Sequence, residues 1–170
     1  MGTAYLLLGS NLGNKEDNLN FAFKSLKKIG EIKKYSAIYE TEPWGFSDSR
    51  NFFNMAVCIE TSLNPYELLN EILKIEILAG RKKQSNQWVA REIDIDIIFY
   101  NDSIINEKHL IIPHPQLIFR KFVLVPLNEI TPDFIHPVLG KSICKLLTEC
   151  TDKSKVDYMH IPVINSIIPI

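Results

Sequence analysis

The chain has 170 residues, which is the size of one domain with a substantial core. Hydrophobic residues make up 46% of it and charged residues 23%, as expected of a soluble globular protein. The formal net charge of −1 provides no overall field that would attract nucleic acid or an acidic membrane, so neither is an expected partner.

Cysteine usage and the first residues indicate a cytoplasmic protein. The three cysteines show no CxxC spacing, which predicts neither a disulfide framework nor a zinc site and fits a reducing compartment. The start of the chain lacks the basic segment and long apolar run of a secretion signal. No apolar run is long enough to span a bilayer.

The first part of the chain predicts a strand, a helix and two further strands. Apolar residues 4–8 indicate a buried strand. Asn14 has the position of an N-cap for an amphipathic helix, and Gly30 is a natural residue to follow its end. Residues 32–39 and 52–61 are then expected to form the second and third strands.

A second helix and a fourth strand complete the core. Asn64, Pro65 and Glu67 form a helix start, and Gly80 ends that helix. A basic loop and a strand ending near Tyr100 follow. This order is typical of an α+β, ferredoxin-like βαββαβ core. It predicts an antiparallel sheet with both helices packed on one face, leaving the other face for additional C-terminal elements and a ligand.

The later elements are less regular. Residues 101–102 are expected to turn the chain into a hairpin return over 103–105. Residues 119–127 combine two cations with a core segment, and residues 142–147 predict a short helix.

The tail over 155–170 is apolar and contains two prolines, so it is either an added edge strand or an association surface. We expect one domain over residues 1–170, with a core over about 3–148 and an extra tail over 152–170.

The segment REIDIDIIFY at 91–100 contains the most informative pattern. A strand sends alternate side chains to opposite faces, so Asp94 and Asp96 should point together from one face. Two such carboxylates repel each other unless a cation lies between them, and Mg²⁺ with substrate phosphates suits them. The strand alone fits a solvated acidic face better than a metal site. The apolar residues should share the other face: Ile93, Ile95, Ile97 and Phe99.

Two other residues have both a structural and a functional interpretation. Glu76 lies beside the apolar side of the second helix near its end, where a carboxylate does not stabilise the helix dipole. It is either an acid at the edge of the core or a ligand. His114 lies between two prolines; a lone histidine is more often structural, although it is also a common proton or phosphate partner.

Five stretches together resemble the 6-hydroxymethyl-7,8-dihydropterin pyrophosphokinase family of folate synthesis, which the chain would match over residues 3–148. They occur in the family's order and are YLLLGSNLG (5–13), YETEPWG (39–45), FFNMAV (52–57), REIDIDI (91–97) and IPHP (112–115). The resemblance implies a ferredoxin-like enzyme, a 2-amino-4-hydroxy-6-hydroxymethyldihydropteridine diphosphokinase. Such an enzyme transfers the pyrophosphoryl group of ATP to the pterin hydroxymethyl oxygen and releases AMP. ATP and the pterin are then the expected partners of a monomer or weak homodimer.

The resemblance also implies roles for individual positions. Asp94 and Asp96 correspond to ligands of two Mg²⁺ ions that hold the ATP phosphates, and Arg81 and Arg91 complete the expected catalytic set. The implied ATP contacts are Glu76, Arg81, Lys83, Arg91, His114 and Arg120. The implied pterin contacts are Thr41, Pro43, Trp44, Phe52, Asn54, Trp88 and Phe122.

The chain departs from the family pattern at several positions. Gln87, Val89 and Ala90 replace a cation and a Gly-Pro turn, which bears on loop closure and turnover more than on ATP binding. His109 and Ile111 stand where the family often has Arg and Thr near the nucleotide.

The sequence therefore also fits two other functions. A catalytically weak ATP- or pterin-binding module of the same fold is one. A nucleic-acid binder that uses the basic loop is another, although the net charge and the lack of an aromatic RNA-reading motif disfavour it. Without the resemblance, each of three proposed pterin contacts fits a structural role equally well. Trp88 would then be an aromatic packed on the surface, Phe52 a core residue and Asn54 a partner of strand backbone.

Overall fold

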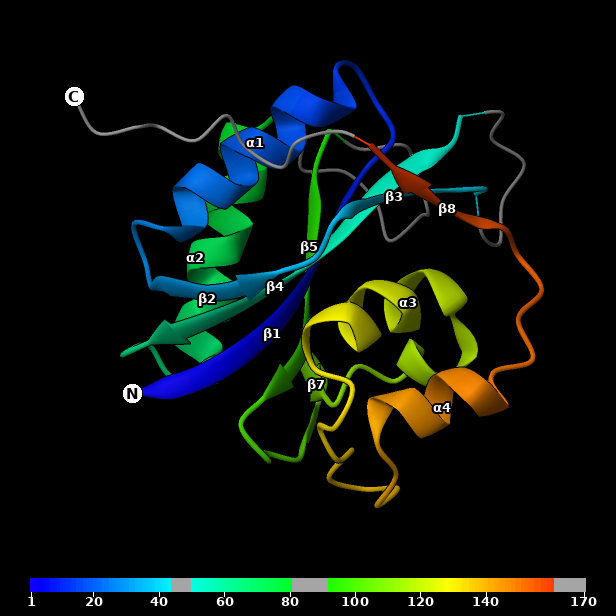
Figure 1. The fold of residues 1–170 in the computed structure, drawn as a ribbon. Helices are drawn as coiled ribbons and strands as arrows, with labels where there is room; N and C mark the ends of the chain where they lie inside the picture. Colours follow the sequence, from blue (N-terminus) through cyan, green and yellow to red (C-terminus); the bar gives the residue numbers. More distant parts are fainter. Residues whose placement is uncertain (44–49, 81–91, 161–170) are drawn as a thin grey trace.

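The computed structural model describes residues 1–43, 50–80 and 92–160 (Figure 1). The order of elements up to Tyr100 confirms the predicted ferredoxin-like arrangement, and two further helices follow it. In chain order the elements are β1 (Gly2–Ser10), α1 (Lys15–Leu26), β2 (Glu31–Tyr35), β3 (Ile38–Thr41), β4 (Phe52–Thr61), α2 (Pro65–Leu78), β5 (Asp94–Tyr100), β6 (Ile105–Glu107), β7 (Leu110–Ile112), the 3-10 turn η1 (Leu117–Phe119), α3 (Lys121–Ile130), α4 (Ile143–Glu149) and β8 (Val156–Met159).

The main sheet is antiparallel, with the strand order β5-β1-β4-β3-β8, and β2 also pairs with β4. The single strand expected over 32–39 is divided into β2 and β3. The reason is local, because the Ser36 hydroxyl takes the place of a regular ladder bond. It accepts a hydrogen bond from Ala56 N–H at 2.9 Å and donates one to the Ala37 carbonyl at 2.7 Å.

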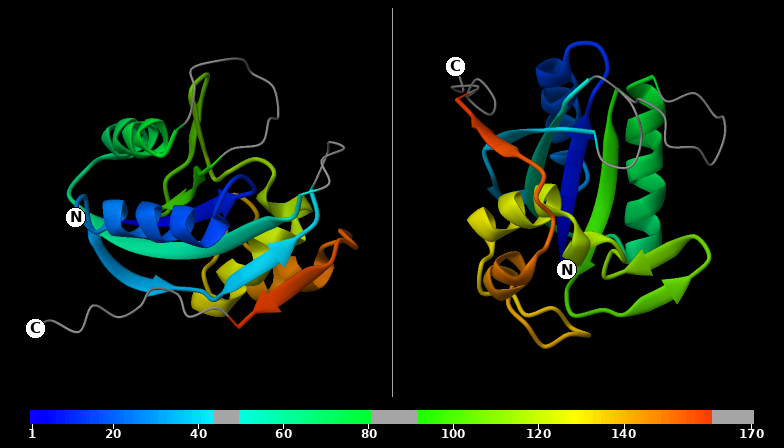
Figure 2. Two further views of the ribbon diagram at one scale, coloured as in Figure 1. Left: turned by 90° about the horizontal axis from the view of Figure 1, so that it is seen from above. Right: turned by 90° about the vertical axis from the view of Figure 1, so that its right-hand side faces the viewer.

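Helices α1 and α2 lie together on one face of this sheet (Figure 2). Their first turns begin at the predicted caps: Asn14 accepts from Asp17 N–H, and Asn64 forms a reciprocal capping box with Glu67. Their apolar sides bury a core against alternate residues of the strands, including Leu6 and Leu8 of β1. This confirms the predicted one-sided packing of the two helices.

Helices α3 and α4 cover part of the opposite face and enclose a second core (Figures 1 and 2). Helix α3 is bonded to β3 through Glu129, whose carboxylate accepts from Ala37 N–H at 3.0 Å and from the Tyr39 hydroxyl at 2.9 Å. Burial is the larger cause and the hydrogen bond to Glu129 the smaller one, and together they raise the pKa of Tyr39 to about 12. The sheet is thus shared by two cores, one on each face.

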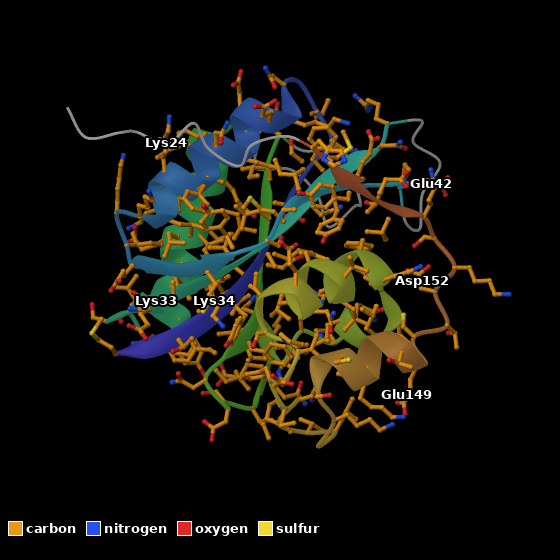
Figure 3. The ribbon with its side chains drawn as sticks, in the orientation of Figure 1. Lys24, Lys33, Lys34, Glu42, Glu149 and Asp152 are labelled. Carbon is orange, nitrogen blue, oxygen red and sulfur yellow. The ribbon has the colours of Figure 1, made fainter. Side chains whose placement is uncertain are left out.

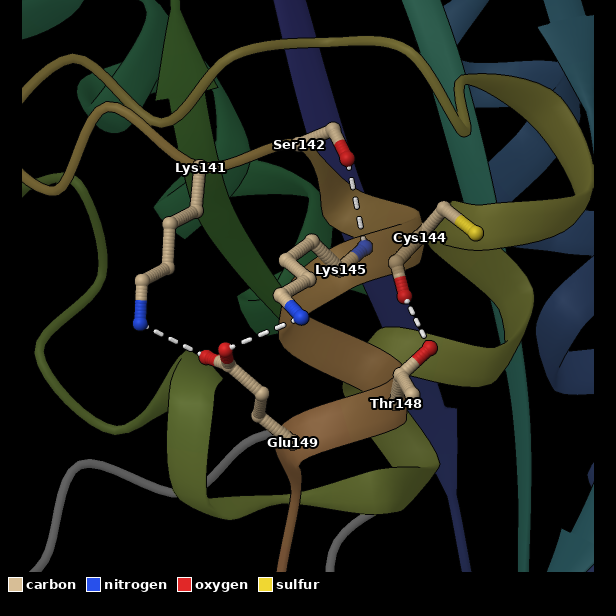
Figure 4. Close-up of polar contacts among 6 residues, drawn as sticks. All are labelled: Lys141, Ser142, Cys144, Lys145, Thr148 and Glu149. Atoms are coloured by element: carbon tan, nitrogen blue, oxygen red, sulfur yellow. Dashed lines mark hydrogen bonds and ion pairs between the residues drawn. The ribbon is translucent and has the colours of Figure 1, made fainter.

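Helix α4 confirms the predicted short helix. The Ser142 hydroxyl accepts from Lys145 N–H at 3.2 Å and so caps its first turn (Figure 4). Near the other end, Glu149 is paired with Lys141 at 2.7 Å and with Lys145 at 3.4 Å. The two lysines lower the pKa of Glu149.

Two further expectations change in the structure, and one of the two alternatives for the tail is confirmed. Phe99 does not share a face with Ile97, because the β1–β5 register shifts and both Ile98 and Phe99 enter the second core. The hairpin after Tyr100 pairs β6 with β7 instead of returning along β5. The tail supplies an edge strand: β8 pairs antiparallel with β3, while residues 161–170 lie outside the described part.

In the parts of the chain that the structure describes, we find no helix with the length and hydropathy needed to traverse a bilayer.

Candidate active site

The acidic pair lies on the face of the sheet that α1 and α2 leave open. Ile93, Ile95 and Ile97 enter the core under those helices, so Asp94 and Asp96 point to the other side, as alternation predicted. On β1, Gly9 pairs with Asp94 and also with Asn54 of β4. Directly paired residues share a face, so the carboxylate and the amide lie in one row with a glycine between them.

Gly9 keeps this row open. A Cβ atom at Gly9 would lie 3.2 Å from Asn54 Oδ1 and 4.0 Å from a ring carbon of Phe52. The absence of a side chain therefore leaves space between the acidic strand and the amide. Gly9 belongs to the YLLLGSNLG motif, and its pairing opposite Asp94 gives it a role as the floor of the site.

Asn54 is held by a side chain of the neighbouring strand. Its Nδ2 donates to Thr41 Oγ1 at 2.7 Å, and both residues are buried. The amide oxygen lies toward Gly9. Thr41 ends β3, and the half-buried Phe52 begins β4 beside it. Thr41, Phe52 and Asn54 therefore gather at one end of the sheet, and Asn54 pairs with a hydroxyl instead of strand backbone.

Arg120 and His114 approach the acidic pair from the segment before α3. Arg120 is only 4% exposed, and burial lowers its pKa while the charges of Asp96 and Asp94 raise it. Burial also lowers the pKa of His114 to about 4, with Arg120 acting in the same direction and Asp94 opposing. Charges act on a pKa in this way only at short range, so Arg120 and His114 lie near the acidic pair, and we call these four residues the cluster.

The bonds of His114 define which ring nitrogen carries the proton. Its backbone N–H donates to the Ile98 carbonyl at 3.0 Å, which fixes the residue beside β5. Its Nδ1 accepts from Gln116 N–H at 3.2 Å. A neutral imidazole that accepts at Nδ1 carries its hydrogen on Nε2, so His114 presents an uncharged donor.

Phe122 lies next to Arg120 at the beginning of α3. The Arg120 guanidinium carbon is 5.7 Å from the centre of the Phe122 ring, which is a cation–π distance. A predicted ATP contact and a predicted pterin contact therefore come from the same helix start.

Glu76 is buried, with 2% of its surface exposed, and its Oε1 accepts from Ile95 N–H at 2.9 Å. Ile95 stands between the two aspartates, so this carboxylate joins α2 to the acidic strand. The nucleotide contact expected of Glu76 stays a prediction. Pro43 is half-buried just after β3. The departing residues His109 and Ile111 are exposed on the β6–β7 hairpin.

Several expected site residues lie outside the described part of the chain. They are Trp44, Arg81, Lys83, Trp88 and Arg91, together with the departures Gln87, Val89 and Ala90.

The donor chemistry of the cluster fits a hard cation. Two carboxylates one pleat apart are oxygen ligands of the kind that Mg²⁺ accepts while it keeps water and phosphate oxygens. The Arg120 guanidinium and the His114 N–H add groups that favour phosphate.

Comparisons with known proteins agree with these features. The profile of the family described as 7,8-dihydro-6-hydroxymethylpterin-pyrophosphokinase matches residues 5–132. The chain is 44% identical over 153 residues to the 2-amino-4-hydroxy-6-hydroxymethyldihydropteridine pyrophosphokinase of Aquifex aeolicus, covering 90% of this chain and 95% of that one. It is 45% identical over 129 residues to the Bacillus subtilis protein of that name, covering 75% and 77%.

Two longer proteins contain a similar part. The crystal structure of Plasmodium falciparum HPPK-DHPS superposes with a TM-score of 0.72 at 21% identity, covering 87% of this chain and 42% of that chain. The chain thus spans less than half of that protein, and the similarity concerns the fold. The folic acid synthesis protein of Pneumocystis carinii is 41% identical over 152 residues, which are 20% of its length.

Proposed function

The chain belongs to the 7,8-dihydro-6-hydroxymethylpterin-pyrophosphokinase family, and on that premise we propose how the open face of its sheet performs the reaction. The enzyme transfers pyrophosphate from ATP to the hydroxymethyl group of 6-hydroxymethyl-7,8-dihydropterin in folate biosynthesis, giving AMP and the pterin diphosphate. The assignment of its residues depends on one observation, the row of Asp94, Gly9 and Asn54 across three strands.

At the acidic end of the row, we propose that Asp94 and Asp96 would hold two Mg²⁺ ions together with ATP. Bound there, these ions would neutralise the phosphate charge that repels an incoming alcohol. Arg120 and the Nε2–H of His114 donate to phosphate oxygens from the other side of the cluster. The remaining proposed ATP contacts are Glu76, Arg81, Lys83 and Arg91.

At the other end of the row, Asn54 reads the polar edge of the pterin. Its amide is oriented before substrate binds, because Nδ2 is already bonded to Thr41. Phe122 offers an aromatic face for stacking on the flat heterocycle. The proposed wall of this pocket also includes Pro43, Trp44, Phe52 and Trp88.

The two ends bring the reactants together over Gly9. The pterin hydroxyl oxygen attacks the β-phosphorus of ATP, the bond between that phosphorus and the α–β bridging oxygen breaks, and AMP leaves with the bridging oxygen. The hydroxyl proton passes to solvent, and we assign no side chain as base. Holding both reactants on one rigid face supplies much of the rate, since positioning replaces a bimolecular encounter.

The test is AMP formation from ATP in the presence and absence of the pterin, with Asp94→Asn, Asp96→Asn and the control Asp102→Asn. Asp102 is exposed in the turn after β5, so the same chemical change there should leave turnover unchanged. We expect each of the first two variants to fold normally and to lose at least roughly 100-fold in kcat. Equal AMP with and without pterin would reject the transfer, and near-normal activity in either variant would reject the metal role.

We also propose that the protein works in a reducing cytosol, since Cys58, Cys144 and Cys150 are all free thiols. Its state as a monomer or weak homodimer that binds no nucleic acid remains a prediction that light scattering and RNA titration would check.

A further inference from the structure

Helix α3 begins without a cap of its own. The preceding residue, Arg120, makes no capping hydrogen bond with its side chain. The acceptor for the first N–H of the helix comes instead from Asp152, 31 positions after Lys121. Asp152 Oδ2 accepts from Lys121 N–H at 2.8 Å, and Asp152 Oδ1 accepts from Ser154 N–H at 2.9 Å. Figure 3 labels Asp152 beside the start of α3. A carboxylate at this place also suits the positive end of the helix dipole.

The protonation behaviour of Asp152 agrees with a bonded, charged cap. Burial would raise the pKa of this carboxyl, but the hydrogen bonds from Ser154 and Lys121 outweigh it, and the pKa is lowered. Asp152 therefore keeps its charge at neutral pH.

The capped helix start carries two residues of the proposed site. Arg120 precedes Lys121, and the negative charges of Asp96 and Asp94 act on its guanidinium. Phe122 follows it and lies against the Arg120 guanidinium. Asp152 therefore binds the backbone of Lys121, which lies between Arg120, the proposed phosphate contact, and Phe122, the proposed pterin contact.

The same segment then reaches the opposite wall of the site. Beyond Asp152, strand β8 pairs with β3, and Val156 lies opposite Thr41. Thr41 is the residue that orients the Asn54 amide. Figure 1 shows the link from α4 passing α3 before it joins the edge of the sheet as β8.

We propose that residues 152–159 form a strap that fixes the two walls of the substrate site relative to each other, with Asp152 as a positioning residue for Arg120 and Phe122. The proposal rests on the function proposed above, because only then do these walls bind substrates. It assigns a role to a segment that the sequence analysis treated as an extra tail.

The experiment compares Asp152→Ala, Asp152→Asn and Asn64→Ala in the full chain. Asn64 caps the start of α2, far from the proposed site. The residue before it, Leu63, accepts a hydrogen bond from the Tyr100 hydroxyl, and Tyr100 is at the opposite end of β5 from Asp94. Loss of either cap should lower Tm by a similar few degrees, roughly 2–4 °C. The alanine variants are therefore matched for stability but differ in their distance from the site.

We expect Asp152→Ala to lower kcat/KM for ATP and for the pterin roughly tenfold or more at a temperature where it is fully folded, since small displacements of positioning groups have effects of this size. Asn64→Ala should keep the values of the unmodified chain. Asp152→Asn retains one acceptor oxygen, so its kcat/KM should lie between those of the unmodified chain and the alanine variant.

The result that overturns the strap is an Asp152→Ala enzyme with the same kcat and KM values as Asn64→Ala. An asparagine variant no better than alanine also contradicts it. Failure of the proposed function has a different signature, because the unmodified chain would then form no pterin-dependent AMP.

Discussion

The imidazole of His114 lies between groups of opposite charge. Burial is the largest influence on its pKa, Arg120 acts in the same direction, and Asp94 opposes them. With a pKa of about 4, the ring is neutral at physiological pH and can donate to a phosphate oxygen without adding charge. Its contribution to substrate binding should therefore not change between pH 6 and 8.

The shifted pKa of His114 makes stability depend on pH in a defined window. Its folded-state value, about 4, lies below the ordinary 6.5, so between these values the unfolded chain binds more protons. Stability should fall as pH drops through this window, by at most roughly 3 kcal/mol from this residue. Urea unfolding at several pH values should show a shallower fall for His114→Asn than for the unmodified chain.

The matched control is His109→Asn, because His109 is exposed on the β6–β7 hairpin. This variant should keep the full pH dependence. Burial also lowers the pKa of His136, so His114→Asn should remove only part of the fall. Identical curves for His114→Asn and His109→Asn would contradict the assignment.

Residue positions could be predicted from the sequence where a local rule applies. Strand alternation alone put Asp94 and Asp96 on one face, and this is confirmed. It failed at Phe99, because an extra residue in the ladder cannot be read from apolar spacing. The cap at Asp152 could not be predicted, since its partner lies 31 residues away.

At the scale of elements, Glu76 joins a helix to the strand that carries the acids. Strand β5 lies at the edge of the sheet, and the carboxylate satisfies the N–H of Ile95 between the two aspartates. A buried acid near the end of α2 is not explained by the helix dipole. Its bond to Ile95 explains it instead, since a buried N–H without an acceptor would be destabilising.

Substitutions at Glu76 should separate this structural role from the predicted nucleotide contact. Glu76→Ala should lower the free energy of unfolding by about 1–3 kcal/mol, because it removes the acceptor of Ile95 N–H. Glu76→Gln keeps an acceptor oxygen, so most of the stability should remain. Urea unfolding measures both. If the alanine variant keeps the KM for ATP at a temperature where it is fully folded, the nucleotide role of this residue is rejected.

Elements were predictable where their ends carry sequence signals. Asn14 and Asn64 marked the starts of α1 and α2, and both act as caps. Helix α3 gave no such signal, because its cap is remote and Pro126 lies inside it. A proline inside a helix removes one backbone hydrogen bond, so the presence of Pro126 in the sequence disfavours a helix over these residues. Packing of Leu124 and its neighbours against the sheet compensates for that loss.

At the scale of the whole molecule, one sheet serves two cores. Residues such as Leu6 and Leu8 face α1 and α2, whereas Leu7 and Ala56 face α3 and α4. Neither core can lose its order without exposing strands that the other core needs. We therefore expect the protein to unfold as one unit.

A substitution in the second core tests this. Leu124 has no exposed surface, and Leu124→Ala should lower the free energy of unfolding by about 2–5 kcal/mol. Circular dichroism and tyrosine fluorescence should report one shared urea transition. Leu139→Ala is the control, because Leu139 is 43% exposed and its loss should have little effect. Separate transitions for the two probes would show that the cores unfold independently.

The added strand β8 also determines what kind of edge the sheet presents to other molecules. Without it, the hydrogen-bonding groups of β3 on that side would be available for pairing with a foreign chain. The strand that takes this outer position has only four residues, Val156–Met159, and its Asp157 forms an ion pair at 2.8 Å with Lys155, the residue just before the strand. Short, charged edge strands are poor templates for intermolecular β-pairing. The segment that holds the site together should thus also protect the protein from aggregation at high concentration.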